Sequence, residues 1–157
     1  MPREKQNKLF QEFDTYTQLG IIGESAVLNE FVRLGLQCYL PYGDLEKSDI
    51  VVSFKGTLKR IQIKSVYSVT DGYINVHITS RARTQNYKYN ADEIDYIAIY
   101  SYELNQCFLV PIEEVEGLTQ IKLRIDAPKN NNSVNIRWAK DYALSKVVSE
   151  ILASMGI

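Results

Sequence analysis

The chain has 157 residues, of which 45% are hydrophobic and 24% charged, proportions that are ordinary for one globular domain. Its 18 basic and 19 acidic side chains give a net charge of -1, so a surface for a polyanion would have to be local. One histidine and two cysteines exclude zinc hydrolases and histidine-rich catalytic sites, which need several such ligands. Any catalysis would therefore depend on carboxylates, lysine and a hard metal ion.

The cellular location is predicted from what the chain lacks. Its N-terminal stretch has no apolar segment typical of a signal peptide, and no run of about 18 apolar residues could span a membrane. Cys38 and Cys107 lie in apolar, strand-like segments, which favours buried free thiols over a disulfide framework. We therefore expect a cytoplasmic protein in a reducing environment, without membrane contact.

The hydrophobic pattern predicts helices at both ends of the chain and strands between them. Apolar residues at steps of three and four predict a helix from Thr15 to Leu34, which Gly35 would end. A similar stripe predicts a helix from about Ile136 to Met155. The expected strands are 37–40, the two arms of a hairpin within 48–67, 73–79, 94–102, 107–112 and 121–125.

This order of elements predicts an α/β (α+β) fold with a central mixed β-sheet flanked by helices. No repeat or change of composition divides the chain. We expect a single domain, 1–157, with a core at about 15–112 and a C-terminal strand and helix within 121–155.

Two glycines lie inside the first predicted helix. Gly20 and Gly23 each lower intrinsic helix stability by roughly 1 kcal/mol relative to alanine. Glycine is favoured where another backbone comes close, so we expect a strand or a nucleic-acid backbone to approach the helix there.

The stretch 48–67, SDIVVSFKGTLKRIQIKSVY, is typical of a β-hairpin whose arms meet at its Lys-Gly pair. With a two-residue loop, the numbers of paired residues sum to 111, which places Asp49 opposite Gln62. Because side chains alternate along a strand, Lys64 would share the face of Gln62. One face would then collect a carboxylate, a carboxamide and an ammonium; a three-residue loop, or an ordinary exposed strand face, is the alternative.

These groups have the chemistry that phosphodiester cleavage requires. Mg²⁺ takes hard oxygen ligands, usually one or two carboxylates with neutral oxygens and waters. Asp49 is the candidate anionic ligand, and Gln62 Oε1 and the Ile63 carbonyl are candidate neutral ligands. Lys64 could hold the attacking water or stabilise charge on the phosphate. Glu24, on the first predicted helix, could supply a further carboxylate directly or through water.

The order of these residues resembles the PD-(D/E)xK nuclease superfamily, in which a helix glutamate precedes a strand aspartate and then [D/E/Q]-x-Lys on the next strand. The matching sequences are GIIGESA at 20–26, SDIVV at 48–52 and IQIKS at 61–65. Glutamine in place of the usual acid is more specifically similar to the bacterial group I intron-encoded homing endonucleases. The resemblance implies a restriction-endonuclease-like core with the catalytic residues Glu24, Asp49, Gln62 and Lys64.

The resemblance also implies an activity: sequence-specific cleavage of double-stranded DNA with Mg²⁺, by a homotetramer. Two departures from the usual motif are Ser48 before Asp49, where proline is common, and the missing acid at Gln62. The alternatives are a restriction-type endonuclease or a Holliday-junction resolvase on the same core, or a non-catalytic DNA-binding module. The C-terminal helix or an edge strand could supply self-association, unless that helix belongs to an ordinary core.

Two basic segments are candidates for DNA contacts. The first, SRARTQNYKYN at 80–90, mixes cationic, amide and aromatic side chains, which suit contacts with base edges and phosphates. Its candidate residues are Arg81, Arg83, Gln85, Tyr87 and Lys88, interleaved with Thr84, Asn86 and Tyr89. The second segment, at the hairpin tip, offers Lys55, Lys59 and Arg60. Solvated basic loops are the alternative for both.

Overall fold

The computed structural model describes residues 15–43, 46–82, 85–126 and 135–156, and the side chains of 80–87 are not among the features described. The elements in chain order are α2 (Thr15–Arg33), β1 (Gln37–Tyr39), β2 (Ile50–Phe54), β3 (Thr57–Val66), β4 (Tyr73–His77), β5 (Thr79–Ala82), β6 (Gln85–Lys88), β7 (Tyr96–Ser101), β8 (Gln106–Pro111), α3 (Ile112–Val115), β9 (Gln120–Arg124), the 3-10 helix η1 (Ala139–Tyr142) and α4 (Leu144–Ser154).

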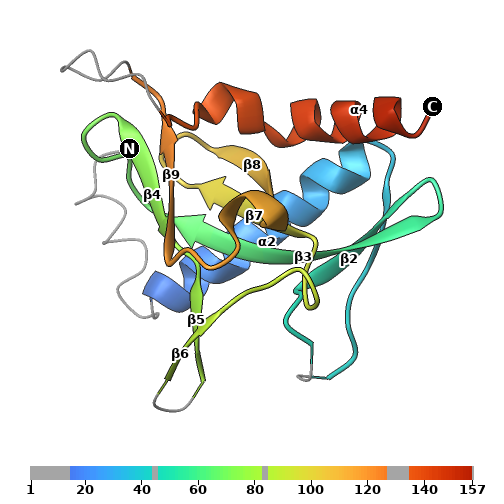
Figure 1. Cartoon of the computed structure of the whole chain (residues 1–157), viewed down its shortest axis with the longest axis horizontal. Helices are drawn as coiled ribbons and strands as arrows, with labels where there is room; N and C mark the ends of the chain where they lie inside the picture. The colour runs from blue at the N-terminus through green and yellow to red at the C-terminus, as the bar shows by residue number, and fades with distance from the viewer. Residues whose placement is uncertain (1–14, 44–45, 83–84, 127–134, 157) are drawn as a thin grey trace.

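A five-stranded mixed sheet forms the centre of the molecule, in the order β1-β2-β3-β7-β8 (Figure 1). Strands β3 and β7 run parallel, and the other neighbouring pairs are antiparallel. Two further two-stranded sheets, β4–β9 and β5–β6, lie outside it. The predicted α+β fold with a central mixed sheet is confirmed.

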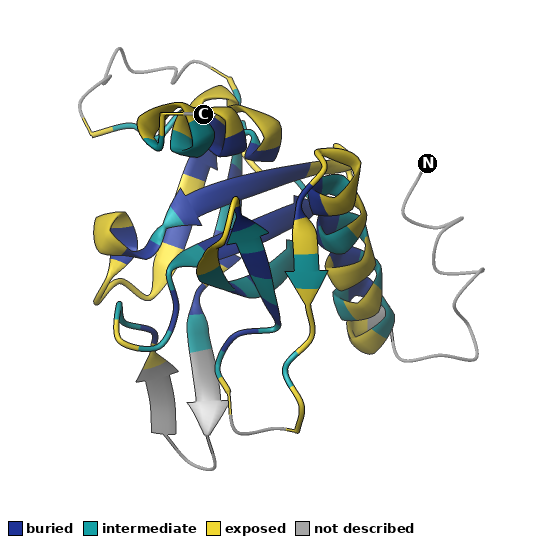
Figure 2. Cartoon of the chain, turned by 90° about the vertical axis from the view of Figure 1, so that its right-hand side faces the viewer, coloured by how far each residue is buried: buried dark blue, intermediate teal, exposed yellow. Residues whose placement is uncertain are grey.

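Each face of the sheet has its own apolar core. On one face, α2 and α4 pack through side chains such as Phe31 and Val148 against β2, β3, β7 and β8. On the other face, β4, β9 and α3 pack through residues such as Ile74 and Leu123 against β7 and β8. Figure 2 shows the buried residues gathered in the sheet and on the sides of the helices that face it. Within the described ranges, no helix combines the length and apolarity needed to cross a membrane.

The β2–β3 hairpin has the predicted register. Paired residues run from Phe54 opposite Thr57 to Ile50 opposite Ile61, so the numbers of each pair sum to 111. The loop residues Lys55 (φ 52°) and Gly56 (φ 96°) both adopt positive φ. Two-residue loops with this geometry match the right-handed twist of the strands, which is why a Lys-Gly pair can set the register here.

The close approach expected at the helix glycines occurs at Gly23. A Cβ atom added there would lie 1.8 Å from Ser65 Oγ and 3.1 Å from Ser65 Cβ. At Gly20, by contrast, an added Cβ would meet no atom of the neighbouring described elements within 4 Å. Gly23 therefore lets α2 rest directly on β3.

The C-terminal helix predicted at 136–155 is wrong in its first half. Trp138 (φ -81°, ψ 127°) and Ala143 (φ -51°, ψ 129°) are extended, so η1 and α4 are separate elements. Trp138 forms a β-bridge with Arg124, and Ala143 forms one with Phe108. Pairing with the strands therefore overrides the local helical pattern.

The basic segment 80–90, predicted only as a polar stretch, forms most of the β5–β6 ribbon. The predicted strand 73–79 is divided, because β4 ends at His77 and the Ile78 amide donates to Thr119 O (3.0 Å). The ribbon then pairs Thr79 with Lys88 and projects from the body of the molecule (Figure 1).

Candidate active site

Asp49 lies just before β2, where β3 loses its antiparallel partner. The Asp49 amide donates to Ile61 O (2.8 Å), and Asp49 Oδ2 accepts a hydrogen bond from the Ile63 amide (2.8 Å). The carboxylate thus takes the place of the next backbone partner of β3, which fixes its orientation. Within the described residues Oδ1 has no hydrogen-bond partner, so it is available to a cation or a water molecule.

Gln62 and Lys64 lie on one face of β3, opposite the face that buries Ile61 and Ile63. Both side chains are half-buried. The Gln62 carboxamide nitrogen donates to Ile63 O (3.4 Å), and Lys64 Nζ lies 5.2 Å from the centre of the Tyr89 ring. The predicted shared face of Gln62 and Lys64 is therefore present. The predicted pairing of Asp49 with Gln62 is not found, because the paired residues end at Ile50 opposite Ile61 and the Asp49 amide donates to Ile61 O. The chemical roles of these residues stay predictions.

Glu24 approaches this point from α2. Glu24 is exposed, and the preceding residue, Gly23, packs directly against Ser65 of β3. Partial burial and the charge of Asp49 raise the pKa of Glu24 above the usual value. Burial also raises the pKa of Asp49, an effect that the Ile63 amide and Lys64 oppose. Because the charge of Asp49 disfavours that of Glu24, a cation bound here would be stabilising.

The candidate metal ligands at this point are all oxygen atoms, which suits a hard cation more than a transition metal. Among the residues that the structure describes, no three His, Cys, Asp or Glu side chains gather as a metal-binding group. A divalent ion here would therefore need neutral oxygens. The Ile63 amide binds Asp49, and the Gln62 carboxamide nitrogen contacts the Ile63 carbonyl, so both residues that could supply such oxygens belong to the same stretch of β3. An all-oxygen set completed by water fits Mg²⁺.

The first predicted DNA-binding segment lies on the β5–β6 ribbon. By their backbone, Arg81 is on β5, and Gln85 and Tyr87 are on β6. Lys88 ends β6 and is exposed. Arg83 lies outside the described residues.

The second predicted segment divides into two kinds of residue. Lys55 is exposed in the hairpin loop, and Lys59 is half-exposed on β3. Arg60 instead forms an ion pair with Asp95 (3.2 Å), and its guanidinium also donates to Ala91 O (3.0 Å). These contacts give Arg60 a structural role within the chain, which leaves the two lysines as the more accessible cations.

Tyr89, which the sequence placed among the interleaved residues of the basic segment, is not a surface residue. It is 5% exposed and packs in the apolar core with Ile94, Ile97 and Ile99. The sequence did not predict the contact between Tyr89 and Lys64, because the two residues are far apart in the chain and the local pattern around Tyr89 gives no information about its partner.

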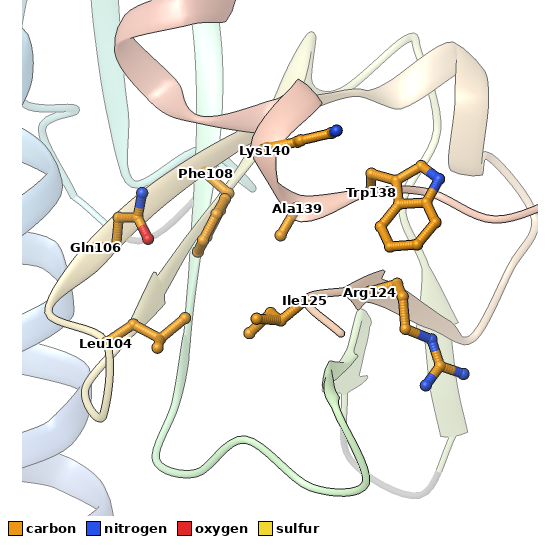
Figure 3. Close-up of a pocket in the computed structure, with 8 residues that line it drawn as sticks. All are labelled: Leu104, Gln106, Phe108, Arg124, Ile125, Trp138, Ala139 and Lys140. Carbon is orange, nitrogen blue, oxygen red and sulfur yellow. The ribbon is translucent and has the colours of Figure 1, made fainter. Parts of the chain in front are cut away.

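A cavity of about 290 Å³ lies elsewhere, between the β7–β8 hairpin, the end of β9 and η1 (Figure 3). Its lining residues are Leu104, Gln106, Phe108, Arg124, Ile125, Trp138, Ala139 and Lys140. None of the predicted catalytic residues lines it. The Arg124 guanidinium stacks on Tyr73 (4.9 Å to the ring centre) and donates to Asp71 O (3.1 Å).

The mixed sheet has an aspartate just before β2, a lysine on the adjoining β3 and a glutamate on α2, the order that the resemblance to PD-(D/E)xK nucleases implies. The chain belongs to the PD-(D/E)XK endonuclease family, whose model matches residues 15–145. A comparison with curated proteins finds no match. Among solved structures, the chain is similar to the bacterial homing endonuclease I-Ssp6803I, with 21% identity, a TM-score of 0.66 and coverage of 90% of this chain and 94% of that one. At this identity the similarity shows a shared fold, and it confirms the predicted resemblance.

Proposed function

We propose that this protein is a sequence-specific, Mg²⁺-dependent endonuclease of double-stranded DNA, of the homing type. The observation that carries the proposal is the convergence at the start of β2. There the Ile63 amide holds Asp49, the charge of Asp49 raises the pKa of Glu24, and the charge of Lys64 on β3 opposes the rise in the pKa of Asp49. Membership of an endonuclease family supports a DNA substrate.

In the proposed site, some residues would bind the metal ion and another would act on the water and the phosphate. Asp49 Oδ1, Gln62 Oε1 and the Ile63 carbonyl would hold the metal ion, with Glu24 joining directly or through water. When bound, Mg²⁺ would neutralise charge on the phosphate oxygens and activate a water molecule. The Lys64 ammonium would orient the attacking water and stabilise the negative charge that develops on the phosphate.

DNA binding would use the cationic elements around this site. The proposed contacts with DNA are Arg83, the ribbon residues Arg81, Gln85, Tyr87 and Lys88, and the hairpin residues Lys55 and Lys59. We also propose that residues 1–157 act as one nuclease domain in the cytoplasm. A homotetramer would allow so small a chain to contact a long duplex.

A non-catalytic DNA-binding module is the second candidate. One observation favours it: position 62 carries a neutral carboxamide, whose nitrogen is turned toward Ile63 O. Such a protein would bind duplex DNA equally well with and without Mg²⁺.

Selection of cleaved molecules from a randomised duplex library tests the proposal. With Mg²⁺, the protein should enrich cleaved molecules that share one sequence; with EDTA, it should enrich none. Four-way junctions and unrelated plasmid DNA, assayed in parallel, distinguish a junction resolvase and a restriction-type enzyme. Tight binding without nicking in any divalent metal would refute the proposal in favour of the binding module.

A further inference from the structure

The ammonium of Lys64 faces an aromatic ring that the core holds in place. Lys64 Nζ lies 5.2 Å from the centre of the Tyr89 ring, within the range of a cation–π contact. Among the described residues, the Lys64 ammonium forms no ion pair. The Tyr89 ring is therefore the group that restricts this flexible side chain.

The ring itself has little freedom. Tyr89 is 5% exposed and packs against Ile97 and Ile99, the residues that pair with Gln62 and Lys64 across β3 and β7. The same neighbouring strand thus supports both the ring and the lysine.

Tyr89 begins the brace segment (residues 89–95), which is fastened to β3 by its own hydrogen bonds. The backbone amide and the guanidinium of Arg60 both donate to Asp95 Oδ2, at 2.7 and 3.2 Å. The guanidinium also donates to the carbonyls of Ala91 and Asp92. On the other side, the Ala91 amide donates to Glu116 Oε1 (3.1 Å).

Arg60 and Lys64 lie on the same face of β3, so the brace segment contacts β3 on either side of Gln62. The brace segment also begins directly after β6, so the chain passes from the proposed DNA-binding ribbon straight to the ring that contacts Lys64. The geometry points to Tyr89 as a positioning residue, which holds the Lys64 ammonium over its ring in the orientation that cleavage needs. This inference rests on the proposed nuclease function and deepens it.

The ring alone should suffice, since within the described part of the chain the Tyr89 hydroxyl has no hydrogen-bond partner. Tyr89→Phe should therefore cleave like the unmodified protein. Tyr89→Leu should lower kcat by about 3- to 30-fold, the range expected for a cation–π contact, with DNA affinity unchanged. Because Tyr89→Leu can also disturb the core, 3,4,5-trifluorophenylalanine in place of Tyr89 gives a second test: it keeps the ring's shape and weakens its attraction for a cation.

Two readouts separate positioning from folding and from the proposed function. In protein with ¹³C-labelled lysine, the ε-methylene signal of Lys64, assigned from its loss in Lys64→Met, should show a ring-current shift in the unmodified protein and in Tyr89→Phe, but not in Tyr89→Leu. Tyr73→Leu is the matched control, because the Tyr73 ring also carries cations, Lys122 at 5.1 Å and Arg124 at 4.9 Å, on the separate β4–β9 ribbon. It should leave kcat unchanged.

A Lys64 signal that is the same in Tyr89→Leu, or full kcat in the trifluorophenylalanine variant, would overturn the positioning role. Absence of cleavage by the unmodified protein would instead refute the proposed function, and the NMR signal would still report whether the ring holds the lysine.

Discussion

Gly23→Ala tests whether α2 is set directly on β3, and with it the placement of Glu24. The new Cβ would lie 1.8 Å from Ser65 Oγ, 3.1 Å from Ser65 Cβ and 3.4 Å from Tyr100 Cβ. Rotation of Ser65 can relieve the first contact but not the second, so the helix must move. Overpacking of this kind costs about 1–3 kcal/mol, and the gain in helix propensity returns about 1 kcal/mol. The free energy of unfolding should fall by up to about 2 kcal/mol, which for a chain of this size lowers Tm by up to roughly 8 °C.

Urea denaturation and thermal unfolding measure the effect, and Gly20→Ala provides the control on the same helix. Within the described part of the chain, no neighbouring element comes within 4 Å of the position of that Cβ, so Gly20→Ala should stabilise the protein by up to about 1 kcal/mol. Ser65→Ala should recover part of the loss in a double variant, because it removes a buried hydroxyl that has no hydrogen-bond partner among the described residues. Cleavage by Gly23→Ala should fall, since small displacements of catalytic groups are costly. If Gly23→Ala stabilised the protein as Gly20→Ala does, the direct contact of helix and strand would be refuted.

Three further predictions concern the proposed metal site. Gln62→Glu should retain cleavage and bind Mg²⁺ more tightly in calorimetric titration, since a carboxylate adds one anionic ligand; an inactive but folded variant would refute a plain ligand role for Gln62. The raised pKa values of Asp49 and Glu24 mean that these groups take up protons at higher pH than free carboxyls do. Cleavage should therefore decline on acidification before free carboxyls titrate, and a rate that stayed constant to below about pH 4 would contradict this. Asp49→Asn should abolish cleavage yet raise the free energy of unfolding of the metal-free protein at neutral pH, measured with urea and EDTA. A folded-state pKa above the unfolded value makes the ionised carboxylate destabilising as pH rises through it, and asparagine can still accept from the Ile63 amide.

The parts of the fold set by local chemistry could be predicted from the sequence. Lys55 and Gly56 fixed the hairpin register through their positive φ, so the strands pair as predicted from Phe54 opposite Thr57 to Ile50 opposite Ile61. Asp49, predicted opposite Gln62, instead contacts the Ile61 carbonyl and the Ile63 amide. The close packing expected at a helix glycine was found at Gly23 and not at Gly20, because the sequence shows a missing side chain but not what approaches it.

Features set by distant contacts could not be predicted in the same way. The C-terminal helix starts late because Trp138 and Ala143 pair with residues of β9 and β8, far away in the sequence. Tyr89 was grouped with surface residues, although the core around Ile97 buries it. The predicted DNA contact at Arg60 likewise could not take account of Asp95, which lies 35 residues later and binds the guanidinium.

The central claim is that Lys64 and its neighbouring carboxylates form a Mg²⁺-dependent phosphodiesterase site. Its most direct test is single-turnover cleavage of a selected duplex by the unmodified protein and by Lys64→Ala, with DNA affinity measured on the same samples. The account predicts Mg²⁺-dependent cleavage that falls by at least about 100-fold in Lys64→Ala while affinity is unchanged. Full cleavage by Lys64→Ala, or binding without cleavage by the unmodified protein in any divalent metal, would contradict it.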